Sequence, residues 1–402
     1  GPPTYPEIEQ YQKLGFKDVW ASPAVVCFSR IWPDYRTTYR GIRGFLRAGA
    51  ERRIGGAMTT TWEWMHGGVV ANSLLGMVYA AECSWSLGKT PVTDYERRYG
   101  QRIFGLAPES AAEQVRDVLE EPWKNEGPAA VLRDSRLMTN LFFEDPRTVR
   151  ARIVLRTPGF SESAQAAYNA VLAAEARLEK LRRECDENWA ARPHVRQESP
   201  AGTGQGQAQA AVPNADLLDY TKLAFDMYRY GMAKVLALEE ASKVYSRARK
   251  LGEGRATQAS ALEEAAKLIE SLPPQLDLCI EVYGRAVAKL GAWRGDVERM
   301  AKQREATVRL AVELRDLAGK VRQGQVKELP TASQFGLTRG RTVRIGTWEP
   351  KEMDEAGCQI RLDVTGKIQA AGDVLVEWNY QRGAHGVSLQ KTELLANGEV
   401  VA

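Results

Sequence analysis

The stretch that most constrains this fold spans residues 54–85, where a strand typical of parallel sheets passes through a short loop into a helix. Residues 54–61 are small, apolar or β-branched over the length of one strand, which favours a strand buried on both faces. Trp62 and Glu63 follow where this run ends, and residues 71–85 form an apolar helical segment. An aromatic ring beside a carboxylate at the carboxyl end of such a strand can stack on a pyranose and accept hydrogen bonds from its hydroxyls. The sequence therefore predicts a sugar-facing loop at Trp62 and Glu63.

The order of residues in this stretch also resembles a known family. Two glycines open the strand, an aromatic and an acid end it, and the helix reads Ala-Glu-x-x-Trp; these residues are Gly55, Gly56, Trp62, Glu63, Ala81, Glu82 and Trp85. The pattern resembles the last βα unit of glycoside hydrolase family 20, the β-N-acetylhexosaminidases. Residues 17–42 resemble the preceding strand and its sugar-facing loop. The resemblance covers about the first quarter of the chain and implies a carbohydrate substrate.

In this family the loop after the preceding strand carries a Tyr and an Asp that hold the acetamido and hydroxyl groups of the substrate. The nearest candidates here are Trp32, Asp34 and Tyr35, although Asp precedes Tyr in this sequence, which reverses the order of the family. A second interpretation fits the same residues equally well. Trp32 would then be a packing residue, and Asp34 the acid that initiates the following helix.

Other residues of the motif have alternative roles. Trp62 is either a stacking platform or a core residue of the strand. His66 lies in the following loop, where it either touches ligand or is simply solvated. Glu82 lies on an apolar helix, so we expect it to be a buried ion-pair or hydrogen-bond partner and not a catalytic acid.

The resemblance implies substrate-assisted chemistry, in which an adjacent Asp-Glu pair follows the fourth strand of the barrel. Asp186-Glu187 is predicted to end a helix and Asp354-Glu355 to lie in a turn, so neither pair follows a buried strand. The sequence thus predicts no catalytic dyad in this chain and no appreciable hydrolysis by it alone.

The composition excludes several other classes of function. The chain has 55 basic and 51 acidic residues, and this net charge of +4 gives no electrostatic case for nucleic acid or an anionic membrane. No apolar run reaches the roughly 20 residues that span a bilayer. The five cysteines are scattered without metal-ligand spacing, so no metal or other cofactor is predicted. The first residues do not indicate a compartment, and the sequence does not give the oligomeric state. The resemblance implies a secreted or periplasmic parent enzyme.

Five regions follow from the patterns along the chain. Residues 1–105 are predicted to be the C-terminal βα units of a TIM-type barrel, a fold of eight strands and about 250 residues, with roughly the first five or six units expected upstream. Residues 106–197 are predicted to be helical, 198–213 a flexible linker, 214–330 a helical bundle, and 340–402 a small antiparallel β-sandwich. The predicted fold class is therefore α/β, followed by all-α and then all-β regions.

Periodicity supports these divisions. Helix-period apolar positions occur in residues 161–185, 214–250, 258–271 and 275–323, and Pro273-Pro274 separates two of these helices. Two apolar stripes consist of Tyr220, Ala224, Met227, Tyr228, Gly231, Val235 and Leu238, and of Leu310, Leu314, Leu317 and Val321. Period-two alternation marks residues 343–347, 360–364 and 374–380, and Asn397-Gly398 is a tight-turn signal. The aromatic residues Trp348, Trp378 and Tyr380 of this last region favour a core role over a sugar platform.

Two functional hypotheses follow. In the first, the chain is the C-terminal portion of a glycoside hydrolase that acts on β-linked N-acetylhexosamine or a similar sugar. In the second, it is a non-enzymatic helical module with a β-region that docks other chains or glycans. An upstream Asp-Glu pair would support the first hypothesis, and an unrelated upstream domain would support the second.

Overall fold

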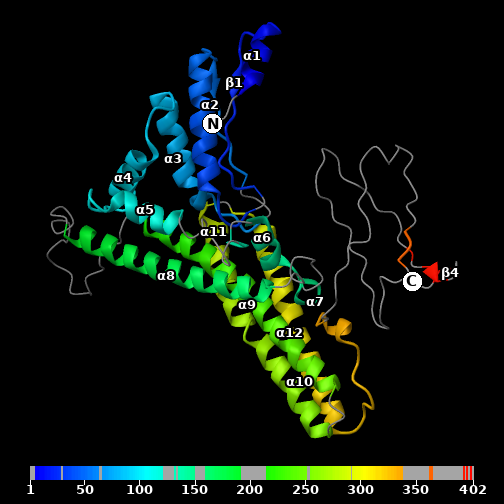
Figure 1. The fold of residues 1–402 in the computed structure, drawn as a ribbon. Helices are drawn as coiled ribbons and strands as arrows, with labels where there is room; N and C mark the ends of the chain where they lie inside the picture. The colour runs from blue at the N-terminus through cyan, green and yellow to red at the C-terminus, as the bar shows by residue number, and fades with distance from the viewer. Residues whose placement is uncertain are drawn as a thin grey trace. The chain divides into compact units, whose positions relative to one another are not determined.

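A computed structural model describes most of the first 337 residues and a few positions beyond them. The described residues are 5–28, 30–62, 66–120, 131–132, 135–149, 159–191, 214–250, 254–290, 292–337, 362–364, 393, 395–396 and 399–400. The chain forms two compact units, residues 1–341 and residues 342–402. Most of the described residues lie in helices (Figure 1).

The first unit contains the two predicted βα units. Strand β1 (Trp20–Ala21) pairs in parallel with β2 (Gly56–Ala57), with Trp20 opposite Gly56. A parallel bridge between Ala24 and Thr60 extends the pairing beyond the strands. Helix α2 (Tyr35–Glu51) follows β1, and α3 (Val70–Ser86) follows β2. Two successive βα units imply neighbouring parallel strands, each followed by a helix, and this arrangement is confirmed.

The prediction that these units are part of a TIM-type barrel is wrong. Among the described residues of the first unit, the sheet consists of these two strands, each two residues long. A barrel strand is paired on both edges, whereas each described strand has one neighbour. The apolar run at residues 54–61 therefore identified a parallel strand correctly, but it carries no information on how many strands flank it.

The two glycines that open β2 are explained by side chains of β1 and the residues before it. A Cβ atom at Gly55 would collide with the Asp18 carboxylate, and one at Gly56 would lie within 3.0 Å of the Trp20 ring. The Trp20 indole N–H donates to Asp18 Oδ1 over 2.7 Å, which fixes the ring in this position. Glycine at these positions allows the strands to approach beneath the indole.

Further helices complete the first unit. The shorter ones are α1 (Pro6–Lys13), α4 (Val92–Ile103), α5 (Ala111–Leu119), α6 (Ser135–Phe143), α7 (Pro146–Val149) and the 3₁₀ turn η5 (Ala332–Phe335). The long ones are α8 (Phe160–Ala190), α9 (Ala215–Lys250), α10 (Arg255–Glu270), α11 (Pro273–Leu290) and α12 (Arg294–Arg322). Helix α9 packs against α3, α6, α8, α10 and α11 and is the centre of the bundle (Figure 1).

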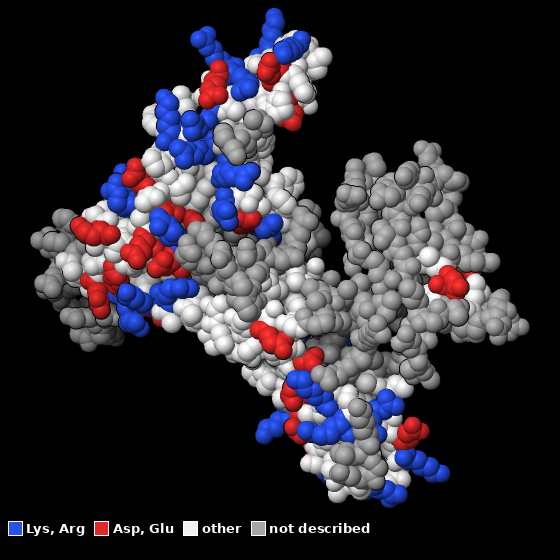
Figure 2. Space-filling model, in the orientation of Figure 1, with Lys and Arg blue, Asp and Glu red and all other residues white. Residues whose placement is uncertain are grey.

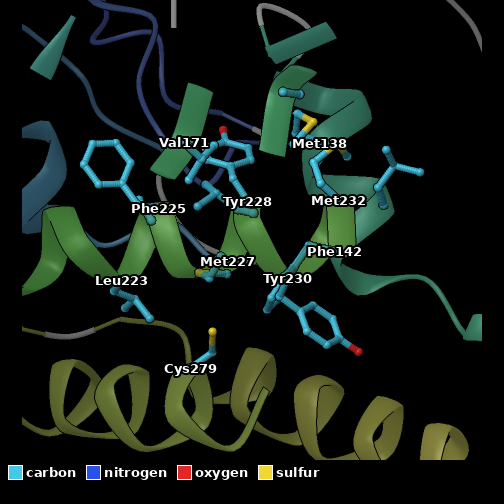
Figure 3. Packing of buried hydrophobic residues seen from close by; sticks show 14 of the residues in the cluster. Met138, Phe142, Val171, Leu223, Phe225, Met227, Tyr228, Tyr230, Met232 and Cys279 are labelled. Carbon is cyan, nitrogen blue, oxygen red and sulfur yellow. The ribbon is translucent and has the colours of Figure 1, made fainter. Parts of the chain in front are cut away.

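The core of this bundle contains many aromatic and sulfur-containing side chains. Figure 3 shows Tyr228 of α9 beside Val171 of α8 and Met232 beside Met138 of α6, while Leu223 points toward the helix that carries Cys279. Both predicted apolar stripes are buried, which confirms the helical faces predicted for residues 214–250 and the second half of 275–323.

Two helix boundaries, near Pro273 and near Trp293, differ from the predicted ones. The segment predicted over 275–323 is divided into α11 and α12, and Trp293 is the N-cap of α12. Pro273 and Pro274 lie in the first turn of α11, where proline removes no helical hydrogen bond, so the predicted break precedes them. The predicted linker at residues 198–213 lies outside the described residues.

The prediction of a β-sandwich in residues 340–402 is also wrong. The described regular structure there is one antiparallel pair, β3 (Leu395–Ala396) and β4 (Glu399–Val400), and residues 362–364 have no regular structure. Ala396 pairs with Glu399, as expected for strands that flank the Asn397-Gly398 signal. The alternation at 343–347 and 374–380, with Trp348, Trp378 and Tyr380, lies outside the described residues. The turn signal at Asn397-Gly398 thus located a hairpin, but it does not show that a second sheet covers that hairpin.

No helix in the described ranges is both long enough and apolar enough to cross a membrane.

Candidate functional site

Trp62 lies at the carboxyl end of the parallel pair with half of its surface exposed. Its side chain is 51% exposed, which excludes the alternative that it is a core residue. Its backbone N–H donates to Cys27 Sγ over 3.1 Å, so the residue after β2 is held against the segment that follows β1. Backbone hydrogen bonds from Thr60 N–H to the Pro23 carbonyl (3.0 Å) and from Val25 N–H to the Thr60 carbonyl (2.9 Å) lead to this contact.

The segment after β1 adds a second aromatic side chain at this end. Phe28 follows the Cys27 thiol that touches Trp62, and its ring is also partly exposed. The carboxyl ends of the two strands therefore present an exposed apolar surface. Such a surface can contact the C–H face of a sugar ring.

Trp32 does not belong to this exposed surface. Only 2% of it is exposed, its indole N–H donates to the Leu119 carbonyl over 3.1 Å, and its ring stacks on Phe225 of α9. These contacts match the packing role that the sequence left open for Trp32 and not the substrate-binding role.

Asp34 and Tyr35 begin α2. The Asp34 side chain accepts hydrogen bonds from the Thr37 N–H (3.0 Å) and the Thr37 hydroxyl (2.8 Å), and Arg30 lies 3.7 Å away. This geometry is that of an N-cap, the alternative role proposed for Asp34. Tyr35 is buried, and its hydroxyl donates to the Asn72 carbonyl of α3. The predicted roles of both residues in sugar binding gain no support from these contacts.

Three further residues of the sequence motif have different surroundings. Glu63 lies outside the described residues. His66 is half-buried in the turn that precedes α3. Glu82 accepts hydrogen bonds from the Thr90 hydroxyl (2.9 Å) and from Arg98 (2.8 Å), which confirms an ion-pair and hydrogen-bond role at a half-buried position.

The turn after the site is held by the helical bundle, a connection that the sequence did not reveal. Gly67 N–H donates to the Asp296 carboxylate of α12 over 2.6 Å. The Tyr283 hydroxyl of α11 lies 3.2 Å from the Gly68 carbonyl and 3.2 Å from the same Asp296 oxygen. Burial raises the pKa of Asp296, although the Gly67 N–H and the Arg299 guanidinium, 3.0 Å away, favour the charged form.

A second cluster of titratable groups lies apart from Trp62, between α2, α4 and α5. Glu96 and Glu120 are buried, and Arg116 lies 2.9 Å from Glu96. Burial and the adjacent Glu120 carboxyl raise the pKa of Glu96 to about 8. One guanidinium compensates one negative charge, so the pair of carboxyls retains a proton. Burial raises the pKa of Tyr39 and Tyr95, and the same carboxyl of Glu96 raises it further.

The Asp-Glu pairs considered in the sequence do not join the site. Asp186 and Glu187 are exposed near the end of α8, as predicted, and Asp354 and Glu355 lie outside the described residues. Over the described part of the face shown in Figure 2, acidic and basic side chains occur together on most of the surface. Within the described ranges, no group of three or more His, Cys, Asp or Glu residues can hold a metal ion.

Comparison with known proteins adds no identification to this geometry. No protein-family model matches the sequence, and no curated protein matches it.

Proposed function

We propose that this chain contributes a sugar-binding subsite to a glycoside hydrolase that acts on β-linked N-acetylhexosamine or a similar sugar. The observation that carries the proposal is the exposed indole of Trp62 at the carboxyl end of two adjacent parallel strands. The order of Gly55, Gly56 and Trp62, followed by the helix that carries Glu82 and Trp85, supports the same assignment because it resembles family 20 of the glycoside hydrolases.

An indole suits a sugar for a physical reason. One face of a pyranose presents C–H groups, which pack against the electron-rich face of an aromatic ring, while the hydroxyls at its edge need hydrogen-bond partners. Trp62 supplies the ring, and Cys27 fixes the backbone from which it projects. In this proposal Glu63 accepts hydrogen bonds from the sugar hydroxyls.

The chain is proposed to bind sugar and not to hydrolyse it by itself. Glycoside hydrolysis needs a group that protonates the leaving oxygen, and general acid–base help is typically worth about a hundredfold to ten-thousandfold. Asp186 and Glu187 lie on helix α8, and the sequence predicts that Asp354 and Glu355 lie in a turn. We therefore expect no turnover of a nitrophenyl N-acetylhexosaminide by the purified chain.

Calorimetric titration of the purified chain with N-acetylglucosamine and its β-linked oligomers tests the proposal. A single stacked sugar should bind with a dissociation constant in the millimolar range, which corresponds to about 4 kcal/mol. Trp62→Ala should weaken binding by about tenfold, the loss expected for roughly 1.4 kcal/mol of ring contact.

The matched control is Trp85→Ala. Trp85 is 93% exposed on α3, so its removal deletes an equally accessible indole at a different place in the chain. This variant should bind sugar as the wild type does. If neither the wild type nor the variants bind, the second hypothesis, a non-enzymatic helical module, replaces the sugar site. Equal losses in both variants would show that the effect is not specific to Trp62 and would contradict the proposed site.

A further inference from the structure

We propose that the helical bundle is a positioning element of the sugar site, in which Asp296 of α12 and Tyr283 of α11 hold the backbone of Gly67 and Gly68, shortly after Trp62. This inference rests on the proposed sugar-binding function. It assigns to the bundle a role beyond packing, because groups from two of its helices meet this backbone directly.

The first step of the argument is the chemistry of Asp296. Its carboxylate is fully buried and accepts hydrogen bonds from the Gly67 N–H (2.6 Å) and from Arg299 (3.0 Å). A buried carboxylate is costly unless its oxygens are paired, and a charged acceptor makes a stronger hydrogen bond with a backbone N–H than a neutral one does. The Gly67 amide is therefore held by one of the stronger contacts available to a loop.

Tyr283 extends this contact to the next residue. Its hydroxyl lies within hydrogen-bond distance of both the Gly68 carbonyl and Asp296, each at 3.2 Å. A hydroxyl donates one proton, so it donates to one of these acceptors at a time. In either arrangement the hydroxyl lies between the loop backbone and the carboxylate of the bundle.

The backbone conformation of Gly67 suits this position. Its φ of +74° is in the left-handed region that favours glycine. A Cβ atom here would also contact Met227 of α9 and Phe143 of α6. At Gly67 the chain therefore lies against Met227 and Phe143 as well as Asp296.

Helix α6 is itself fixed where it meets the loop. The buried Lys234 ammonium of α9 donates to the Phe142 carbonyl (3.0 Å) and the Glu144 carbonyl (2.6 Å), and the Gln303 amide of α12 donates to the same two carbonyls. The Arg299 guanidinium lies 4.0 Å from the centre of the Phe143 ring. These contacts leave little freedom for the surface against which Gly67 packs.

The loop is therefore anchored on both sides of the site. Trp62 N–H is bound to Cys27 on one side, and Gly67 N–H is bound to Asp296 five positions later. These two bonds fix backbone positions near the site before a ligand arrives, which lowers the entropy cost of binding.

Two variants test the inference. Asp296→Asn has nearly the same shape but removes the charge, and Tyr283→Phe removes the hydroxyl alone. Asp277→Asn is the matched control, because Asp277 is an exposed carboxylate of α11 that pairs with Arg304. Each protein is examined by hydrogen exchange of the Gly67 and Gly68 amides and by titration with N-acetylglucosamine.

In Asp296→Asn, exchange of the Gly67 amide should accelerate by about tenfold or more, the effect of weakening a bond to a charged acceptor. Sugar affinity should fall by at least about threefold. The protection of the α9 amides from exchange should stay close to that in the control. Tyr283→Phe should give a smaller change of the same sign. Asp277→Asn should match the wild type in both measurements.

The two readouts separate the inference from the function on which it rests. If the wild type binds no sugar while Asp296→Asn still accelerates exchange at Gly67, the proposed function fails, but Asp296 is still shown to hold the Gly67 amide. If sugar binds and Asp296→Asn leaves the exchange rate unchanged, Asp296 does not fix the loop and the inference is overturned. It is also overturned if exchange accelerates but sugar affinity stays the same, because the loop is then anchored without being positioned.

Discussion

At the scale of single residues, surroundings and not residue type decide which aromatic side chain can meet a ligand. Trp62 and Trp32 follow neighbouring strands, and the sequence made both candidates for sugar binding. The structure leaves Trp62 half-exposed and buries Trp32 against Leu119 and Phe225. Because those partners lie far along the chain from Trp32, no local pattern could have separated the two tryptophans.

This difference predicts opposite effects of two alanine substitutions. Trp32→Ala removes a buried ring and its hydrogen bond, so the free energy of unfolding should fall by about 3–5 kcal/mol. Trp62→Ala removes an exposed ring and should change it by less than about 1 kcal/mol. Urea denaturation followed by far-UV circular dichroism measures both. A similar loss in the two variants would show that Trp62 is also part of the core.

The buried carboxyl pair makes the stability depend on pH. Since burial and Glu120 raise the pKa of Glu96 from its usual 4.5 to about 8, the folded state keeps a proton that the unfolded state releases between these values. The folded state therefore binds more protons across this window, and the free energy of unfolding falls as the pH rises from about 4.5 to 8. Glu96→Gln cannot release that proton and should show a shallower fall between pH 5 and pH 8. If the melting temperature of this variant depends on pH as that of the wild type does, the claim that Glu96 and Glu120 retain a proton is contradicted.

At the scale of elements, the helices and one pair of parallel strands could be predicted, but the number of strands in a sheet could not. The apolar stripe on α9, from Tyr220 to Leu238, is local information, because residues three and four apart share one helical face. The parallel pairing of β1 and β2 was also predictable, since two adjacent βα units favour it. The number of strands depends instead on partners elsewhere in the chain, and for that reason the predicted barrel and sandwich were both wrong.

Substitutions of Asp34 at the start of α2 distinguish its two possible roles, an N-cap and a ligand contact. As an N-cap, Asp34 contributes about 0.5–2 kcal/mol, so Asp34→Ala should lower the free energy of unfolding by that amount. Asp34→Asn should restore most of the loss, because an amide oxygen also accepts from the Thr37 N–H. Both variants should bind N-acetylglucosamine with unchanged affinity in a calorimetric titration. If Asp34→Asn keeps full stability but loses sugar affinity, Asp34 has the ligand role that the family resemblance implies.

At the scale of the whole molecule, the βα units and the bundle belong to one compact unit. Residues 1–341 cluster together, and the hydrogen bond from Gly67 to Asp296 joins residues 229 positions apart. The sequence suggested separate regions because the residue pattern changes near residue 105. Such a pattern reports the local structure of a segment and not what the segment packs against, so neither this unity nor the hydrogen bond from Gly67 to Asp296 was predictable.

This unity predicts that α3 and α9 open together. Because these helices pack against each other, the most protected amides of both, such as those of Tyr79 and Tyr228, should exchange through the same global unfolding. Their free energies of opening, from native-state hydrogen exchange in low urea, should agree. If α3 opens at a much lower free energy than α9, the βα units form an independent domain.

The claim that Trp62 is a sugar platform is tested most directly by the resonance of its indole N–H. In a ¹⁵N-labelled chain, this resonance is assigned by its loss in Trp62→Phe, and N-acetylglucosamine is then added to millimolar concentrations. The Trp62 indole should shift in a saturable way, while the indole of Trp85, which is also exposed, should not shift. A Trp62 resonance that does not move while sugar binds elsewhere, or that moves no more than that of Trp85, would contradict the assignment of the sugar subsite to the carboxyl end of the parallel strands.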